Sequence, residues 1–207
     1  MTQPAEYKAY LVDLDGTLYR QKPVQLAMAL ELILFGIHRI PWLRAFRKEH
    51  EKIRHEARET GAAFEPSPFR AQLSRTAEKL GVSEEKLERV VMSWMFERPG
   101  KWLKRARNEP LLAELRSFRA QGGRTALVSD YPATQKLAAL GERDVFDLVV
   151  ANGETDGLTR LKPAPDGYLL AASRLGIPPE QCLVIGDRTD ADGLAAERAQ
   201  MGFRLIG

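Results

Sequence analysis

Two carboxylates follow a short apolar run near the start of the chain. Residues 9–12 are mostly apolar and lead directly into Asp13, Leu14 and Asp15, after which comes Gly16. An apolar run that ends in turn residues predicts a buried strand whose sheet is covered on both faces. Carboxylates this close repel each other unless a cation or a shared proton relieves the charge. The spacing therefore favours metal or acid–base chemistry at the end of the strand, with an ordinary turn as the alternative.

Two further polar groups come after predicted strands in the second half of the chain. Residues 125–128 predict a strand that ends at Ser129 and Asp130. Residues 148–150 predict another strand, and the loop that follows it carries Lys162. A hydroxyl and a lysine beside a metal would bind phosphate oxygens and balance their charge. Taken alone, Ser129 and Asp130 also fit a cap on the next helix, and Lys162 fits a surface lysine.

A last group of carboxylates follows the strand predicted at residues 183–185. Asp187 comes directly after a glycine, and Asp190 and Asp192 follow it closely. In a parallel sheet the carboxyl ends of the strands share one edge, so these groups can meet Asp13 there. Carboxylates from two strand ends form the oxygen-rich kind of site that suits Mg²⁺. Asp187 also fits a turn, and Asp190 or Asp192 fits the start of a helix.

The order of these motifs resembles that of the haloacid dehalogenase superfamily of phosphatases and related phosphotransferases. The matching positions are Asp13-Leu14-Asp15-Gly16-Thr17-Leu18 for the first motif, Ser129 for the second, Lys162 for the third, and Gly186-Asp187 with Asp192 for the fourth. Together they span residues 9–192, nearly the whole chain. One departure is Gln200, which stands where relatives often have glycine and bears on packing more than on chemistry.

The resemblance implies a mechanism in which each motif has a role. Asp13 would attack phosphorus and form an aspartyl-phosphate, and Asp15 would protonate the leaving oxygen and later activate water. Ser129 and Lys162 would hold the phosphoryl oxygens. Mg²⁺ would be bound by Asp13, the main-chain carbonyl of Asp15, Asp187 and Asp192. The family spacing selects Asp192 for this role rather than Asp190, which is interpreted as a residue at the start of a helix.

The chain between the first and second motifs has a different pattern from the rest. Helical periodicity dominates there, with Pro41 expected to end the first helix and Pro99-Gly100 the last. From residue 109 onward helices and strands alternate, with a final helix expected at residues 190–201 and a last strand at 203–206. We predict an α/β fold: a Rossmann-like parallel sheet with helices on both faces, plus an inserted all-helical cap. The core would comprise residues 1–19 and 109–207, and the cap residues 20–108.

Composition and charge restrict the class of protein. The net charge is +3, but residues 38–107 contain 17 Lys or Arg against 10 Asp or Glu. This basic segment could attract phosphorylated molecules, nucleic acid or an anionic membrane, or be solvated helix surface. The sequence contains one cysteine, Cys182, which fits a reducing compartment. We expect a cytoplasmic protein with no membrane span and no nucleic-acid partner, either a monomer or a homodimer.

Basic and aromatic residues of the predicted cap invite specific interpretations. The candidates for contact with an anionic substrate are Arg20, Arg70, Arg98 and Lys101. The aromatic residues Trp42, Phe46, Trp94, Phe96 and Trp102 are expected to form the core of the cap rather than a stacking platform.

The sequence favours a Mg²⁺-dependent phosphohydrolase that acts on a small phosphorylated metabolite. Asp15 argues against a dehalogenase, which has no leaving oxygen to protonate. The first alternative is a phosphomutase of a sugar phosphate, and the second is a binding or regulatory protein that kept the fold without turnover. A phosphoacceptor receiver domain fits poorly, because such domains lack a large helical insertion after the first strand.

Overall fold

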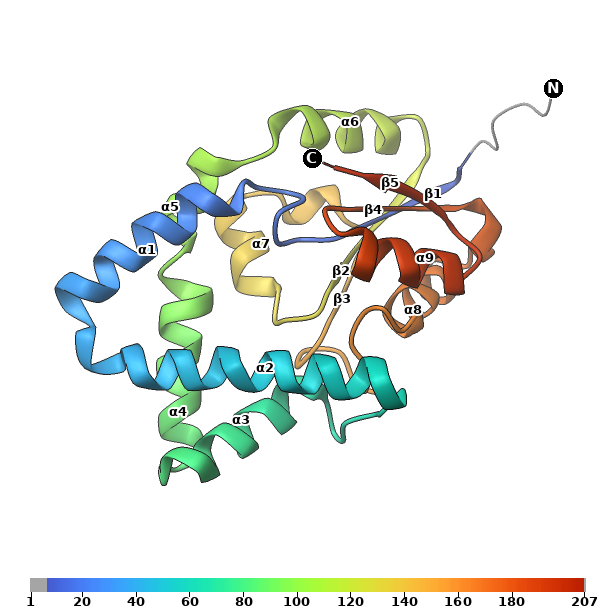
Figure 1. Ribbon diagram of the computed structural model, residues 1–207. Helices are drawn as coiled ribbons and strands as arrows, with labels where there is room; N and C mark the ends of the chain where they lie inside the picture. The colour runs from blue at the N-terminus through green and yellow to red at the C-terminus, as the bar shows by residue number, and fades with distance from the viewer. Residues whose placement is uncertain (1–6, 207) are drawn as a thin grey trace.

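The computed structural model describes residues 7–206, which form a parallel sheet flanked by helices (Figure 1). The sheet has five strands in the order β3-β2-β1-β4-β5, and every neighbouring pair is parallel. The strands are β1 (Ala9–Val12), β2 (Arg124–Ser129), β3 (Leu148–Ala151), β4 (Cys182–Gly186) and β5 (Gly202–Leu205). This architecture confirms the predicted α/β class, because short apolar runs buried on both faces alternate with helices.

The register of the strands brings the predicted site residues to one edge of the sheet. Val12, the last residue of β1, pairs with Leu127 of β2 and with Ile185 of β4. The residues that follow these positions therefore emerge side by side, at the carboxyl edge where open parallel sheets bind ligands.

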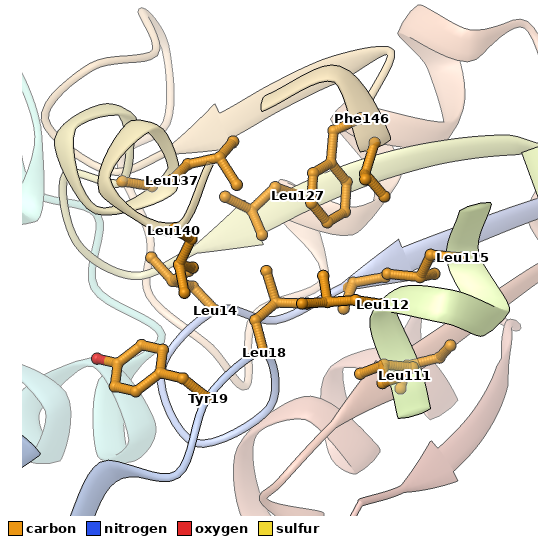
Figure 2. Close-up of a cluster of buried hydrophobic side chains, with 14 of the residues drawn as sticks. Leu14, Leu18, Tyr19, Leu111, Leu112, Leu115, Leu127, Leu137, Leu140 and Phe146 are labelled. Atoms are coloured by element: carbon orange, nitrogen blue, oxygen red, sulfur yellow. The ribbon is translucent and has the colours of Figure 1, made fainter. Parts of the chain in front are cut away.

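Helices cover both faces of the sheet and bury its two sets of apolar side chains. One face is covered by α6 (Glu109–Ala120) and α7 (Thr134–Leu140), whose leucines pack on Leu14, Leu18 and Leu127 (Figure 2). The other face is covered by α8 (Asp166–Leu175) and α9 (Leu194–Arg198), where Tyr168 and small alanines pack on the strands. Successive side chains along each strand point to opposite faces, so each strand contributes residues to both clusters. The sheet is therefore packed between two helical layers.

The segment between β1 and β2 is helical and has an apolar cluster of its own. Its helices are α1 (Gln21–Phe35), α2 (Ile40–Thr60), α3 (Pro68–Leu80), α4 (Glu84–Val91) and α5 (Gly100–Ala106). Phe46, Trp94 and Phe96 belong to this cluster, Trp42 packs against it, and Trp102 packs on the sheet cluster. The prediction that these aromatic residues form the core of the cap is confirmed for Phe46, Trp94 and Phe96, against which Trp42 packs. It is wrong for Trp102, which packs on the cluster of the sheet.

Three helix boundaries differ from the sequence prediction. Pro41 does not end a helix but lies in the first turn of α2, where proline is well tolerated because its missing N–H has no partner to lose. Pro99 likewise precedes a further helix, α5, that the sequence analysis missed. A single helix was expected at residues 190–201. The structure instead has a π-helical turn at Thr189–Gly193, which is followed by the short helix α9 (Leu194–Arg198). Shorter helical turns complete the chain at Ile37–Arg39, Met92–Glu97, Arg143–Val145 and Pro179–Gln181.

No single helix in residues 7–206 has both the length and the apolar character needed to cross a membrane. Gln21–Phe35 and Ile37–Thr60 meet that standard only when taken together, and they are bent by 107° relative to each other.

Candidate active site

Asp13 lies at the centre of the converging side chains. Its backbone N–H donates to the carbonyl of Ile185 (2.9 Å), which ties the end of β1 to β4. Its Oδ1 accepts a hydrogen bond from Lys162 Nζ (2.6 Å), and its Oδ2 accepts one from Thr17 Oγ1 (3.2 Å). Burial first, and then the negative charge of Asp192, raise the pKa of Asp13 to about 7, although the nearby Lys162 ammonium acts to lower it. The carboxylate is thus held in a site that disfavours unbalanced negative charge.

Lys162 connects the carboxylates of two strand ends. Its buried ammonium group donates to Asp13 Oδ1, to Asp192 Oδ1 (2.8 Å) and to the carbonyl of Val128 (3.0 Å). Burial alone would lower the pKa of Lys162, but the surrounding carboxylates, Asp13 first, raise it well above its ordinary value. The lysine therefore stays charged and faces the position where an anionic group would meet Asp13.

Three carboxylates form a candidate metal site. One oxygen from each of Asp13, Asp187 and Asp192 lies within 4.8 Å of the other two. A Cβ at Gly16 would overlap the Asp187 carboxylate, and one at Gly186 would overlap that of Asp192. Gly16 also has φ +99°, a conformation that glycine adopts without strain. All the donors are oxygens, as Mg²⁺ prefers, so the site fits a hard divalent cation.

Asp190 and Asp192 point to different surroundings. Asp192 is buried, and Tyr168 Oη donates a hydrogen bond to its Oδ1 (2.8 Å). Asp190 is half exposed and accepts hydrogen bonds from Arg58 (2.6 Å) and Arg188 (2.6 Å). Asp190 thus pairs with α2 of the helical segment instead of facing Asp13.

Asp15 is held by two side chains that the sequence analysis did not identify. Both of its oxygens accept hydrogen bonds from Lys136 Nζ (2.7 and 2.9 Å), and Tyr19 Oη donates to its Oδ1. Burial by itself would raise the pKa of Asp15, but the Lys136 charge and the two donors together lower it. Asp15 is therefore ionised in this arrangement.

Ser129 and Asp130 lie at the end of β2, on the edge that carries Asp13. Ser129 is buried and its Oγ accepts a hydrogen bond from the N–H of Tyr131 (3.2 Å). Asp130 Oδ1 accepts one from the N–H of Lys162 (3.1 Å), which fixes the loop that presents the lysine. The alternative that these residues cap the next helix is wrong, because Glu154 accepts hydrogen bonds from the first N–H groups of α7.

The side chains that sequence reasoning missed all come from helices or from the loop after Asp15. Lys136 lies on α7 and Tyr168 on α8, and each approaches the site through the packing of its helix on the sheet. Nothing in the sequence distinguishes Lys136 from any other lysine on a helix. Tyr19 is buried and directly follows the first motif. In the sequence, the only indication of its role is that it lies close to Asp13 and Asp15.

Three of the four basic residues proposed to contact substrate have other partners. Arg70 forms an ion pair with Glu88 (2.7 Å). Arg98 (3.9 Å) and Lys101 (2.7 Å) both pair with Glu31. These ion pairs all lie within the helical segment, and contact of the three residues with a substrate stays a prediction.

Comparison with known proteins gives a consistent family signal. A family model described as haloacid dehalogenase-like hydrolase matches residues 7–200. The fructose-1-phosphate phosphatase YqaB of Escherichia coli (strain K12) is 50% identical over 64 residues, which are 30% of this chain and 31% of that protein. The match therefore spans only about a third of YqaB's length. A longer match, 27% identical over 93% of this chain and 80% of the relative, is to the 5-amino-6-(5-phospho-D-ribitylamino)uracil phosphatase YigB of the same strain.

The fold also superposes on solved structures. The HAD-hydrolase YfnB of Bacillus subtilis, described as bound to magnesium and showing interdomain movement, gives a TM-score of 0.62 at 16% identity. The superposition covers 97% of this chain and 89% of that one. At this level of identity the likeness concerns the fold.

Proposed function

Because the chain belongs to the haloacid dehalogenase-like hydrolases, we propose that it is a Mg²⁺-dependent phosphatase of a small phosphorylated metabolite. The observation that carries the proposal is the convergence of Asp13, Lys162 and the carboxylates Asp187 and Asp192 at one edge of the sheet. A nucleophile, a fixed cation for phosphate and an oxygen-rich metal site are what transfer of a phosphoryl group to a carboxylate requires.

In the first step, a carboxylate oxygen of Asp13 attacks phosphorus in line with the leaving oxygen, and an aspartyl-phosphate forms. Lys162 and Ser129 hold the equatorial phosphoryl oxygens as charge shifts onto them. The leaving oxygen takes its proton from Asp15, which must therefore gain a proton before this step.

In the second step, water attacks the aspartyl-phosphate and releases inorganic phosphate. Asp15, ionised because Lys136 and Tyr19 hold it in that form, accepts the proton of the attacking water. The same two side chains fix the orientation of the carboxylate, so Lys136 is a positioning residue for the acid–base step.

Asp13, Asp187, Asp192 and the main-chain carbonyl of Asp15 would bind the metal. When bound there, Mg²⁺ neutralises charge on the phosphoryl oxygens and on the crowded carboxylates. The raised pKa of Asp187, caused by burial and then by the charge of Asp192, is consistent with a site arranged for a cation.

The helical segment is proposed to act as a cap over this site. We assign residues 1–19 and 109–207 to the catalytic core and residues 20–108 to the cap; residues 1–6 and 207 lie outside the part of the chain that the structure describes. The apolar cluster within the segment supports a separate unit. A cap that closes over the carboxylates would exclude water during the first step and contact the substrate beyond its phosphate.

The experiment that tests this function measures inorganic phosphate released from a panel of sugar, nucleotide, glycolate and lipid-precursor phosphates, with Mg²⁺ or with EDTA. Release that needs Mg²⁺ and is lost in Asp13→Asn supports the proposal. Unchanged release in EDTA or in Asp13→Asn contradicts it. Isomerised sugar phosphate in place of free phosphate would indicate a phosphomutase.

A direct measurement of metal affinity separates the two neighbouring aspartates. By calorimetry, Asp192→Asn is expected to weaken Mg²⁺ binding by at least about tenfold, a loss typical of disturbing a metal site. Asp190→Asn is the matched control, because its carboxylate pairs with Arg58 and Arg188, and its Mg²⁺ affinity should equal that of the wild type. Equal losses in both variants would contradict the assignment of Asp192.

A further inference from the structure

A cavity of about 420 Å³ opens next to the acid–base residue of the proposed site. Tyr19 and Lys136 line this cavity, and both donate hydrogen bonds to Asp15. The cavity therefore begins where the leaving group of a phosphomonoester would sit. Its volume lies in the range of pockets that bind small organic ligands.

The wall of the cavity is mostly apolar. It is lined by Val24, Met28 and Leu32 of α1, together with Leu43 of α2 and Trp94. The lining also includes Gln21 and Gln25, but a sugar or polyol held against the apolar side chains would leave the hydroxyl groups that face them without hydrogen-bond partners, which is costly. A hydrocarbon group would instead gain free energy by leaving water.

Two arginines add positive charge at the exposed side of the cavity. Arg44 and Arg47 of α2 line it, both are exposed, and neither forms an ion pair with any residue in the range 7–206. Their charge would attract a phosphate dianion toward the opening without requiring a polar leaving group.

We propose that the substrate is a phosphomonoester whose leaving group is an apolar chain, and that this cavity binds the chain. The inference rests on the proposed phosphatase function and narrows its substrate class. The phosphate would lie at Asp13 and the ester oxygen at Asp15, with the chain between α1 and α2.

Phosphate release from n-alkyl phosphates of increasing length tests this inference in wild-type protein with Mg²⁺, below the micellar concentration of each compound. We expect kcat/KM to rise from ethyl to octyl phosphate by about fourfold per methylene, the scale expected for burying a CH₂ group. Sorbitol 6-phosphate, a polar compound of similar length, should be a poor substrate. A preference for sorbitol 6-phosphate over octyl phosphate would overturn the proposal.

Matched variants localise the effect to the cavity. Ala29 lies at the exposed side of the cavity on α1, and Ala29→Trp is expected to reduce the octyl-to-ethyl ratio of kcat/KM by at least about tenfold, the loss of roughly two buried methylenes. Ala113→Trp, at an exposed position of α6, should keep the ratio of the wild type. An unchanged ratio in Ala29→Trp would overturn the assignment of the cavity.

A binding measurement separates failure of this inference from failure of the proposed function. Octylphosphonate resists hydrolysis, so calorimetry of its binding with Mg²⁺ needs no turnover. Tighter binding of octylphosphonate than of ethylphosphonate, with no phosphate released from any substrate, would support the cavity and contradict the phosphatase. Equal binding of the two phosphonates would contradict the cavity whatever the turnover.

A second inference concerns the outer surface of α1, which does not face the cavity. Leu26 is 75% exposed, Leu34 62%, Phe35 70% and Ile37 63%. These side chains lie on α1 and on the turn that joins it to α2, a corner of the helical segment that lies away from the sheet (Figure 1). Exposed apolar side chains that gather on one surface are typical of an interaction site.

The charge around this surface indicates its partner. Residues 20–48 carry six Lys or Arg against one acidic residue, Glu31. Arg44 and Arg47 line the cavity, which leaves four basic residues for the surface outside it: Arg20, Lys22, Arg39 and Lys48. Glu31 is buried and paired with Lys101 (2.7 Å), so it does not offset the exposed charge. A second copy of the chain would bring like charges together, whereas an anionic bilayer matches both the apolar side chains and the basic ones.

We infer that α1 docks on an anionic phospholipid surface. Sedimentation with vesicles of phosphatidylcholine containing phosphatidylglycerol should retain the protein, and neutral vesicles or high salt should release it. The double variant Leu26→Gln and Leu34→Gln should bind at least about tenfold more weakly, since two large apolar side chains no longer insert.

Leu169→Gln with Leu205→Gln, which changes exposed leucines elsewhere, is the matched control and should bind as the wild type does. Failure to bind anionic vesicles would overturn the inference. So would a dimer in solution that the substitutions at Leu26 and Leu34 dissociate, because the surface would then be covered by a second copy.

Discussion

Asp15 and its two donors show how single side chains set the chemistry of this site. Burial ordinarily raises the pKa of a carboxyl group, yet the charge of Lys136 and the hydrogen bonds from Lys136 and Tyr19 lower the pKa of Asp15. Asp15 is thereby prepared to accept a proton from water, and the earlier donation of a proton requires that substrate binding weaken its contact with Lys136. The balance between the two steps thus depends on one lysine.

Replacing this lysine is expected to change the pH dependence of turnover. In Lys136→Met the pKa of Asp15 should rise, because burial remains while the compensating charge is lost. The limb of the kcat profile that reports Asp15 should then move to higher pH. Lys104→Met, at an exposed position of α5, is the control and should leave the profile unchanged. A profile that does not move in Lys136→Met would show that Lys136 does not tune Asp15.

At the level of elements, the end of α9 contains a backbone conformation that its residue does not favour. Gln200 has φ +58°, in the left-handed region, and its side chain is exposed. A residue with a Cβ in this region costs about 1–2 kcal/mol relative to its usual conformations. The turn is required because it leads from α9 into β5.

Gln200→Gly should therefore raise the free energy of unfolding by about 0.5–1 kcal/mol, part of the gain being offset by the greater freedom of glycine in the unfolded chain. Chemical denaturation measures it. Gln121→Gly provides the contrast, because Gln121 has φ −88° and gains nothing from glycine. Gln200→Gly that is no more stable than the wild type would contradict the account of strain.

The packing of α2 on α3 buries a histidine in its neutral form. His50 Nε2 lies 3.1 Å from an Arg54 guanidinium nitrogen and its Nδ1 lies 3.3 Å from Gln72 Oε1. Nε2 is therefore the acceptor and Nδ1–H the donor. Burial, followed by the charge of Arg54, lowers the pKa of His50 to about 3.

This histidine should make the protein less stable in acid. Below its ordinary pKa of about 6.5, His50 takes up a proton only in the unfolded chain, so stability falls as the pH falls toward the folded pKa. Between about pH 6 and pH 4, the unfolding free energy of the wild type should fall more steeply than that of His50→Gln, by about 1 kcal/mol per pH unit. His55→Gln, at an exposed position, should match the wild-type slope. Identical slopes for wild type and His50→Gln would contradict this assignment.

The sequence predicts the strand ends well because the signal there is local. An apolar run followed by Asp13 or Asp187 predicts both the strand and the carboxylate at its end. The parallel sheet then brings these carboxylates together. Lys136 and Tyr168 could not be predicted in this way, since they reach the site only through the packing of α7 and α8 on the sheet. The boundary at Pro41 failed for a related reason: a proline ends one helix and begins another with the same local signal.

For the molecule as a whole, the contacts between the helical segment and the sheet decide how the proposed cap moves. Arg58 reaches Asp190 from α2, and the N–H of Phe69, at the start of α3, donates to Asn152 Oδ1 (2.9 Å). Phe64 N–H donates to the carbonyl of Thr159 (2.8 Å). All three contacts join the helical segment to the rest of the chain, so opening of the proposed cap must break them.

Asn152→Ala is expected to favour this opening. The buried N–H of Phe69 then has no acceptor in the closed state, which destabilises that state by about 1–2 kcal/mol. Hydrogen exchange that depends on opening should therefore be roughly 5–30-fold faster. The increase should be confined to residues near the start of α3, while the amides of the sheet keep their protection. Asn108→Ala, which removes the N-cap of α6, should affect α6 instead. Unchanged exchange at Phe69 in Asn152→Ala would show that this contact does not hold the cap.

The most direct test of the account is the capture of phosphate on Asp13 itself. Protein mixed with a turned-over substrate and Mg²⁺ would be quenched in acid within one turnover, digested, and analysed by mass spectrometry. The account predicts a phosphorylated peptide that contains Asp13, with no phosphorylation in Asp13→Asn. Phosphate on another residue, or release of phosphate by Asp13→Asn at the wild-type rate, would contradict it.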